Sequence, residues 1–283
     1  MNRLIFSLKL EYNGLSYELS NFNANKPFLS CEYNIEKNAS DRVNQSTFSI
    51  YNLPIRISQY FSKNENEQKD ISIVFSVGNS DDNIISQVFS GKVSTCLSND
   101  DITTVTEISA FPIADVKIYS QISLTKGSTV KDLKTIFAGK LGLLLDNQVD
   151  DGEQQIQQDY NVITDDILGT ARKKFYNQNI LINDNRLVFL KKTDKNTKIK
   201  DISHIFTETN GLLKLTPHGE IIEIENFLRP NVSINDCVFL DKRINNGKSY
   251  NGTYYVSGLN HSGKISYTES TLNTSVFQLK KSI

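Results

Sequence analysis

Apolar and polar residues alternate along the first 118 residues, as they do in half-buried β-strands. In LIFSLKLEY, residues 4–12, every second side chain is apolar. Similar segments recur as FLSCEYNIEK, STFSIYNLP, DISIVFSVG, NIISQVFSGKVSTCLS and TTVTEISAFP, separated by turn residues such as GNSDD and SNDD. Several short strands at regular spacing predict a barrel or a sandwich.

Two details refine this first region. In STFSIYNLP we expect Phe48, Ile50 and Asn52 to mark one face of a strand that Pro54 ends. Residues 55–61 then predict a short helix before the chain returns to the strand pattern.

The pattern changes to helical spacing after residue 119. Thr129 and Asp132 resemble a capping box that opens a helix. A second helix is expected to begin near Asp165 and Asp166, whose carboxylates suit a helix N-terminus. The inner face of the first helix comprises Val130, Leu133, Ile136, Phe137 and Leu141, and that of the second Ile167, Leu168, Ala171 and Phe175. ILIND and NRLVFL then predict a hairpin that turns at residues 184–185.

Strand patterns return after residue 201, in GEIIEIEN, DCVFLDKR, GTYYVSGLNHSGK and STLNTSVFQLKK. The order of segments therefore predicts three parts: a first β-barrel-like domain over 1–118, an α+β insert domain over 119–200, and a second β-barrel-like domain over 201–283.

Composition narrows the class of protein. The chain has 283 residues, 38% of them hydrophobic, which suffices for a substantial core. A formal net charge of −1 does not favour generic binding to nucleic acid. Three widely spaced cysteines form no disulfide or zinc pattern and are expected to be buried, reduced thiols, which suits folding in a reducing cytoplasm. The N-terminus is not expected to be a signal peptide, and no stretch reaches the length of a membrane span.

Charge is unevenly distributed in the middle of the chain. Residues 145–166 contain seven acidic residues and no Lys or Arg, whereas residues 191–200 contain five lysines and one aspartate. Both segments are expected to be solvated loops, and a surface that faces a partner is the alternative.

The segment GLNHSGKI, residues 258–265, falls one residue short of the phosphate-binding pattern G-x-x-x-x-G-K-[ST]. Ile265 occupies the position of the hydroxyl that would bind magnesium, and the following ISYTESTLNTSVFQL is not a helical sequence. We therefore expect no nucleotide site, and residues 261–264 predict a hairpin connection.

Other chemistry is equally weakly indicated. His204, His218 and His261 lack metal-ligand spacing, and His218 and His261 are expected to be turn residues. No G-x-S-x-G nucleophile motif occurs. Acidic doublets lie where turns or a helix start are expected, at residues 81–82, 100–101, 150–151 and 165–166. The sequence thus predicts no catalytic, cofactor-binding or metal-binding residues, and no enzyme.

The order of several motifs carries a resemblance. TFSIYNLP leads to DISIVFSVGNSDDNIISQVFSGKVSTC, in which residues 88–93 carry a Phe-x-Gly element. LTKGSTVKDLKTIFA and DDILGTARKKF follow, and FLRPNVSINDCVFLD and NGTYYVSGLNHSGK come near the end. In this order the motifs resemble the phage baseplate hub proteins of contractile-tail phages and related injection systems.

The resemblance implies a mainly β fold with a small α+β insert and two barrel-like hub domains related by pseudo-symmetry. It also implies a structural virion protein of the tail baseplate, assembled in the host cytoplasm. Its homotrimeric ring would join the tail tube to the central spike and adapt sixfold to threefold symmetry. The implied partners are further copies of the chain, the spike protein and a tube or tube-initiator protein, with tape measure and baseplate wedge proteins as further candidates. DNA would only pass through the channel. No cofactor is implied.

Two other functions are open from the residues alone. One is a β-rich glycan-binding or adhesin module that acts without catalysis; the chain has no Trp, but Tyr and Phe could provide a binding platform. The other is a hydrolase that uses an acidic pair.

Overall fold

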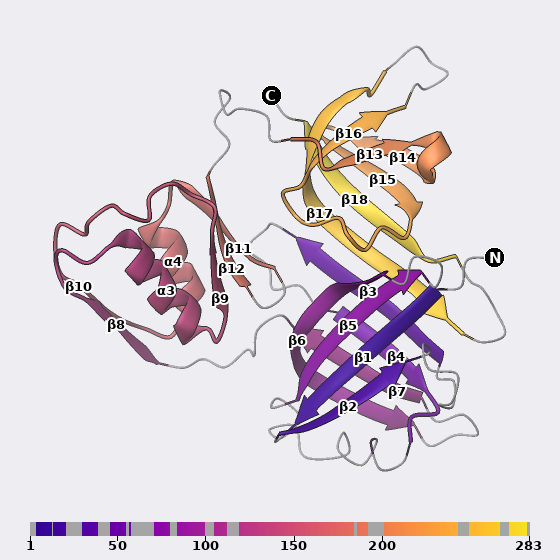
Figure 1. Cartoon of the computed structure of the whole chain (residues 1–283), viewed down its shortest axis with the longest axis horizontal. Helices are drawn as coiled ribbons and strands as arrows, with labels where there is room; N and C mark the ends of the chain where they lie inside the picture. Colours follow the sequence, from indigo (N-terminus) through magenta and orange to yellow (C-terminus); the bar gives the residue numbers. More distant parts are fainter. Residues whose placement is uncertain are drawn as a thin grey trace. The chain divides into compact units, whose positions relative to one another are not determined.

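The chain folds into two compact units (Figure 1). A computed structural model describes residues 4–12, 14–20, 30–38, 46–54, 57, 71–79, 84–99, 105–111, 119–183, 186–191, 201–242, 249–266 and 272–281. Residues 1–112 together with 198–283 form the first unit, and residues 113–197 form the second. The fold is mainly β with a small α+β part, as the sequence predicts.

The N-terminal part of the first unit is an antiparallel sheet. Its strands are β1 (Leu4–Tyr12), β2 (Leu15–Ser20), β3 (Ser30–Asn38), β4 (Ser46–Tyr51), β5 (Ser72–Asn79), β6 (Ile84–Asn99) and β7 (Val105–Phe111). They pair in the order β3-β4-β7-β6-β5-β1-β2. The alternation read from the sequence holds, because Phe6, Leu8 and Leu10 are buried and enter a core built around Phe75.

The 16-residue strand β6 pairs with two neighbouring strands. Its first half pairs with β5 and its second half with β7, with a register shift in each ladder. Residues 88–93, with the Phe-x-Gly element, lie in the middle of β6. Bulges of this kind bend a strand, which lets one segment turn between two parts of a curved sheet.

The C-terminal part of this unit contributes β13 (His204–Thr207), the short 3-10 helix η1 (Glu208–Asn210), β14 (Leu212–His218), β15 (Ile221–Phe227), β16 (Cys237–Asp241), β17 (Gly252–Ile265) and β18 (Thr274–Lys281). Strands β14, β15, β18 and β17 lie side by side and antiparallel. On the other edge of β17, β16 pairs antiparallel, and β13 pairs with β16 in parallel.

Strand β17 joins the two β regions (Figure 1). Its residues 252–255 pair with β16, whereas residues 258–265 pair with β3, which lies more than 200 residues earlier in the sequence. β18 pairs along residues 254–262 of the opposite edge. One hydrogen-bonded sheet therefore runs through both β regions. The division into domains at residues 118 and 200 stays a prediction, as does the pseudo-symmetry of the two regions.

The prediction of a hairpin at residues 261–264 is wrong, because these residues lie inside β17. Gly263 is needed for close approach and not for a turn: a Cβ at this position would lie 1.9 Å from Oδ1 of Asn273. Asn52 was expected on the same face of β4 as Phe48 and Ile50, but it follows that strand, is exposed and has φ of 57°, a left-handed conformation that Asn tolerates.

The second unit has an α+β architecture. It comprises β8 (Ser120–Leu124), α3 (Val130–Lys140), β9 (Leu144–Asn147), β10 (Tyr160–Thr164), α4 (Ile167–Lys174), β11 (Gln178–Asn183) and β12 (Arg186–Lys191). Figure 1 shows both helices between the β8–β10 pair and the sheet of β11, β12 and β9. Both predicted helices are confirmed, with apolar faces that enter one core. The hairpin of β11 and β12 is confirmed too, although residues 184–185 lie outside the described ranges.

Local hydrogen bonds explain where the two helices begin. The amide N–H of Asp132 donates to Oγ1 of Thr129 over 3.1 Å, and the amide of Thr129 donates to Oδ2 of Asp132 over 2.9 Å. This is the predicted capping box. The Oδ1 of Asp166 accepts the amide N–H of Gly169 over 2.8 Å at the start of α4.

The acidic segment 145–166 is not simply a solvated loop. It includes residues of β9 and all of β10, and Asp151 is buried beside Lys134. Within the basic segment only Lys191 is described. Of the short helix expected over 55–61, only Ile57 is described; it is buried, and its amide donates to the carbonyl of Pro54.

The three cysteines Cys31, Cys96 and Cys237 are buried thiols that take part in no disulfide, as predicted. Burial raises the pKa of the Cys31 and Cys96 thiols to about 12, so they are poor nucleophiles near neutral pH. In the described part of the chain, no helix combines the length and the apolar character needed to cross a bilayer.

Replacement of Gly263 by Ala should destabilise the first unit by about 1–3 kcal/mol. The added Cβ displaces Asn273, which is buried, accepts a hydrogen bond from Tyr33 and donates one to the carbonyl of Lys264. Urea unfolding measures the change. Gly258→Ala is the matched control in the same strand, because its Cβ meets the flexible end of the exposed Gln278. Equal stability of the two variants would contradict the close-approach role of Gly263.

Candidate functional site

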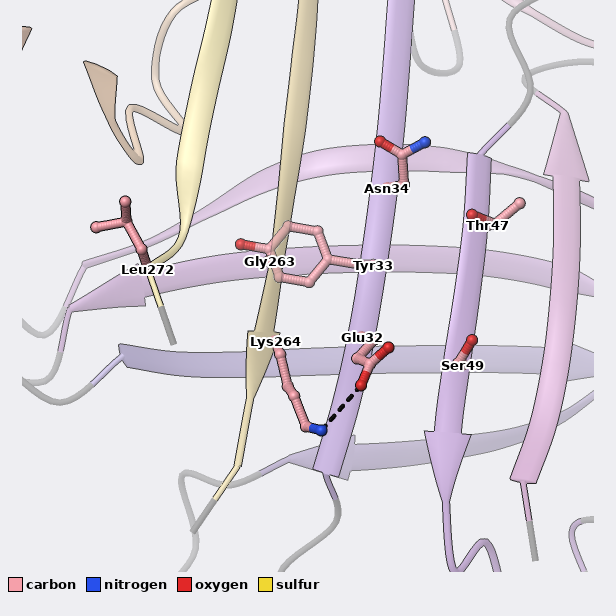
Figure 2. Close-up of a pocket in the computed structure, with 8 residues that line it drawn as sticks. All are labelled: Glu32, Tyr33, Asn34, Thr47, Ser49, Gly263, Lys264 and Leu272. Carbon is pink, nitrogen blue, oxygen red and sulfur yellow. Dashed lines mark ion pairs between the residues drawn. The ribbon is translucent and has the colours of Figure 1, made fainter. Parts of the chain in front are cut away.

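A groove of about 470 Å³ lies against β17, β3 and β4 (Figure 2). It is lined by Glu32, Tyr33, Asn34, Thr47, Ser49, Gly263, Lys264 and Leu272. Gly263 lies opposite Tyr33 in the strand register, and Figure 2 shows the Tyr33 ring pointing toward it. The groove thus contains Gly263 and Lys264, the Gly-Lys pair of the near phosphate-binding pattern. A phosphate bound by that pattern would lie in this groove.

The charges of the groove neutralise each other. The Nζ of Lys264 lies 2.9 Å from Oε1 of Glu32, and the hydroxyl of Tyr51 donates to the same oxygen over 2.8 Å. The Lys264 hydrogen bond and then the Tyr51 hydrogen bond lower the pKa of Glu32. The ammonium also lies 5.4 Å from the centroid of the Tyr51 ring. Lys264 is therefore engaged within the sheet.

The backbone around Gly263 offers no cradle for phosphate. A phosphate-binding loop needs unpaired amide groups and a helix that begins at the loop. Here residues 258–265 pair with β3 on one edge, and residues 258–262 also pair with β18 on the other. The next described element is the strand β18. The described residues 258–265 are therefore strand and lack the loop and the helix start of a nucleotide site.

The three histidines have different surroundings. His218 is the last residue of β14, so it flanks the turn that begins at Gly219, whose φ is 63°, and is not itself a turn residue. His204 lies in β13, with Nε2 3.3 Å from Oδ2 of Asp236. The expectation of a turn for His261 is wrong: this side chain is 1% exposed, and its Nδ1 lies 2.8 Å from Oγ of Ser275.

A pattern in the sequence could have placed His261 correctly. Leu259, His261, Gly263 and Ile265 occur at every second position, and Leu259, His261 and Ile265 are buried. A turn was predicted here instead of a strand, because glycine and lysine residues are more usual in turns. Among the residues that the structure describes, no three His, Cys, Asp or Glu side chains gather in a way that could hold a metal ion.

We expect no saturable ATP binding at residues 258–264, since this segment is a strand paired with β3 and Lys264 is bound to Glu32. Isothermal titration calorimetry of the wild type and of Lys264→Ala provides the measurement. ATP binding by the wild type that Lys264→Ala abolished would contradict the expectation.

Acid should weaken the first unit through His261. Burial, with a smaller effect of Lys37, lowers the pKa of His261 from 6.5 to about 3. The unfolded chain then binds more protons than the folded chain between these pH values, so stability falls as the pH drops below about 6.5, by up to about 1.4 kcal/mol for each pH unit. His261→Gln should remove this contribution to the slope.

Urea unfolding at pH 7 and pH 5 measures the effect. His218→Gln is the matched control, because that side chain is exposed at the end of β14. An unchanged pH dependence in His261→Gln would show that His261 is not responsible.

Comparison of the sequence with family models and with curated proteins gives no match. Solved structures do match. The 43 kDa tail protein of prophage MuSo2 from Shewanella oneidensis is 12% identical, with a TM-score of 0.59 over 98% of this chain and 97% of that chain. The tail protein from Neisseria meningitidis MC58 is 10% identical, with a TM-score of 0.58 over 98% and 96% of the two chains.

A chain of the Francisella PdpA-VgrG complex in its half-lidded form also matches, with 9% identity and a TM-score of 0.62. All of this chain is covered, and it spans 58% of the longer Francisella chain. At these identities the comparison establishes the fold. The resemblance recognised in the order of motifs is confirmed at that level: the chain has the fold of phage tail proteins.

Proposed function

We propose that this chain is a structural baseplate hub protein of a phage tail or a related injection system. Three copies would form a ring that joins the tail tube to the central spike and adapts sixfold to threefold symmetry. The observation that carries the proposal is the match to the MuSo2 tail protein, which includes 98% of this chain and 97% of that one. A match over both whole chains points to a shared architecture and not to one common module.

The geometry of the candidate site supports a role without catalysis. The cation of the groove is paired with Glu32, the cysteines described are buried, and His261 is enclosed in a sheet. These polar groups are engaged in holding strands together. A structural part of a tail needs rigid pairing of this kind more than it needs an accessible nucleophile or base.

The proposed partners are further copies of this chain, a spike protein and a tube or tube-initiator protein, with tape measure and wedge proteins as further candidates. A chain of the same fold occurs in a complex named PdpA-VgrG, which supports a place within a larger assembly. DNA would pass through the ring without specific recognition, in keeping with a formal net charge of −1. The proposed location is the virion tail baseplate.

Ring closure sets a physical requirement for the surfaces of the subunit. Each copy must contact its neighbours through two different patches, because identical patches would stop at a dimer. We expect strands of the N-terminal β region of one copy to meet the C-terminal β region of the next. Such a contact should exceed the roughly 1,000 Å² that distinguishes a specific interface.

The purified chain, alone and mixed with spike and tube proteins from the same tail, should form a species of three times the 32.0 kDa subunit mass. Light scattering after size exclusion measures this mass, and particle images should show rings. The mixture is needed because ring closure can depend on a partner. A chain that stayed monomeric in every mixture would argue against the hub and favour the adhesin or glycan-binding module.

A further inference from the structure

A buried lysine forms the centre of a polar cluster in the second unit. Lys134 lies on α3 next to the apolar Leu133, and its side chain is 0% exposed. Its Nζ lies 2.7 Å from Oδ1 and 2.9 Å from Oδ2 of Asp151. The same Nζ donates to Oδ1 of Asn147 over 2.9 Å. The amine thus contacts both a carboxylate and a carboxamide.

Asn147 also contacts Asp151 directly, so Lys134, Asn147 and Asp151 each contact the other two. The Nδ2 of Asn147 donates to Oδ1 of Asp151 over 3.3 Å. Gln178 donates from its Nε2 to the other oxygen of Asp151, which fixes the carboxylate in place. The Asp151 carboxylate therefore lies within hydrogen-bond reach of both Nζ of Lys134 and Nδ2 of Asn147.

Aromatic rings enclose the amine. The Nζ of Lys134 lies 4.7 Å from the ring centroid of Phe189 and 5.2 Å from that of Phe175. Both rings belong to the core of the unit. Burial lowers the pKa of Lys134, against the opposing effect of Asp151. Burial thus favours the neutral amine, which is the form of lysine that acts as a nucleophile, over the ammonium.

We propose that Lys134 and Asn147 form an intramolecular amide bond, with Asp151 as the proton carrier. This modification site lies outside the proposed hub function and does not depend on it. A buried ion pair is costly because two charges lose their hydration. Amide formation removes the ammonium from the core and replaces it with a neutral group.

The reaction balances without any oxidant or added reagent. The Lys134 ammonium gives one proton to Asp151, and the lone pair of Nζ attacks Cγ of Asn147. The N–C bond forms while the carbonyl electrons move to Oδ1. Asp151 then protonates Nδ2 and accepts the second proton of Nζ. The carbonyl re-forms, the Cγ–Nδ2 bond breaks, and ammonia leaves. Asn147 is half-buried, so the released ammonia has a short path to solvent.

The mass of the intact, denatured chain tests the proposal. The wild type should be lighter than its sequence by one ammonia, about 17 Da. Trypsin should release a branched peptide in which residues 132–140, uncut at Lys134, are joined to residues 141–172. Asn147→Ala and Asp151→Ala should each retain the full mass expected for their sequence. Lys140→Met, which removes an exposed lysine from the same helix, should keep the loss.

Two results would overturn the amide bond. One is a wild-type chain at its full sequence mass. The other is a loss of ammonia with only linear peptides, as cyclisation of an asparagine on its own backbone would give. Both results are measured on the wild type, as its intact mass and its tryptic peptides, so the test holds even if a variant fails to fold.

Discussion

The pairing of β17 along both of its edges is the interaction on which the first unit depends. A strand in the interior of a sheet must find partners for its backbone groups on two sides, because a buried amide without a partner is costly. The N-terminal half of β17 finds them in β16 and β18, and the C-terminal half finds them in β3 and β18. The two β regions, separated in sequence by the whole second unit, therefore complete one sheet.

Buried polar side chains keep this sheet in register. His261 lies opposite Ser275 in the strand register, and both side chains are at most 1% exposed. Oγ of Ser275 lies within hydrogen-bond distance of His261 Nδ1 and accepts the amide of Arg229. A shift of one residue in the pairing would turn each side chain to the opposite face of the sheet and separate His261 from Ser275.

Local patterns predicted most elements and failed where pairing is distant. The alternation in residues 4–12 and the capping box at Thr129 involve neighbours in sequence, so β1 and α3 could be predicted. The place of Gly263 depends on Tyr33 and Asn273, and that environment exists only after folding. The cluster of Lys134 was missed for the same reason. A lysine in a helix is normally solvated, and Asp151 approaches it from a turn 17 residues later. The groove could not be predicted, since β17 completes it from a part of the sequence far from β3 and β4.

The length of β17 has a mechanical consequence. It is a single strand of 14 residues that pairs with one β region near its start and with the other near its end. A pull that separated the two regions along the strand would load many hydrogen bonds at once, in shear. A pull across the strand would instead open them one after another. Resistance to force should therefore be strongly directional, and greatest along β17.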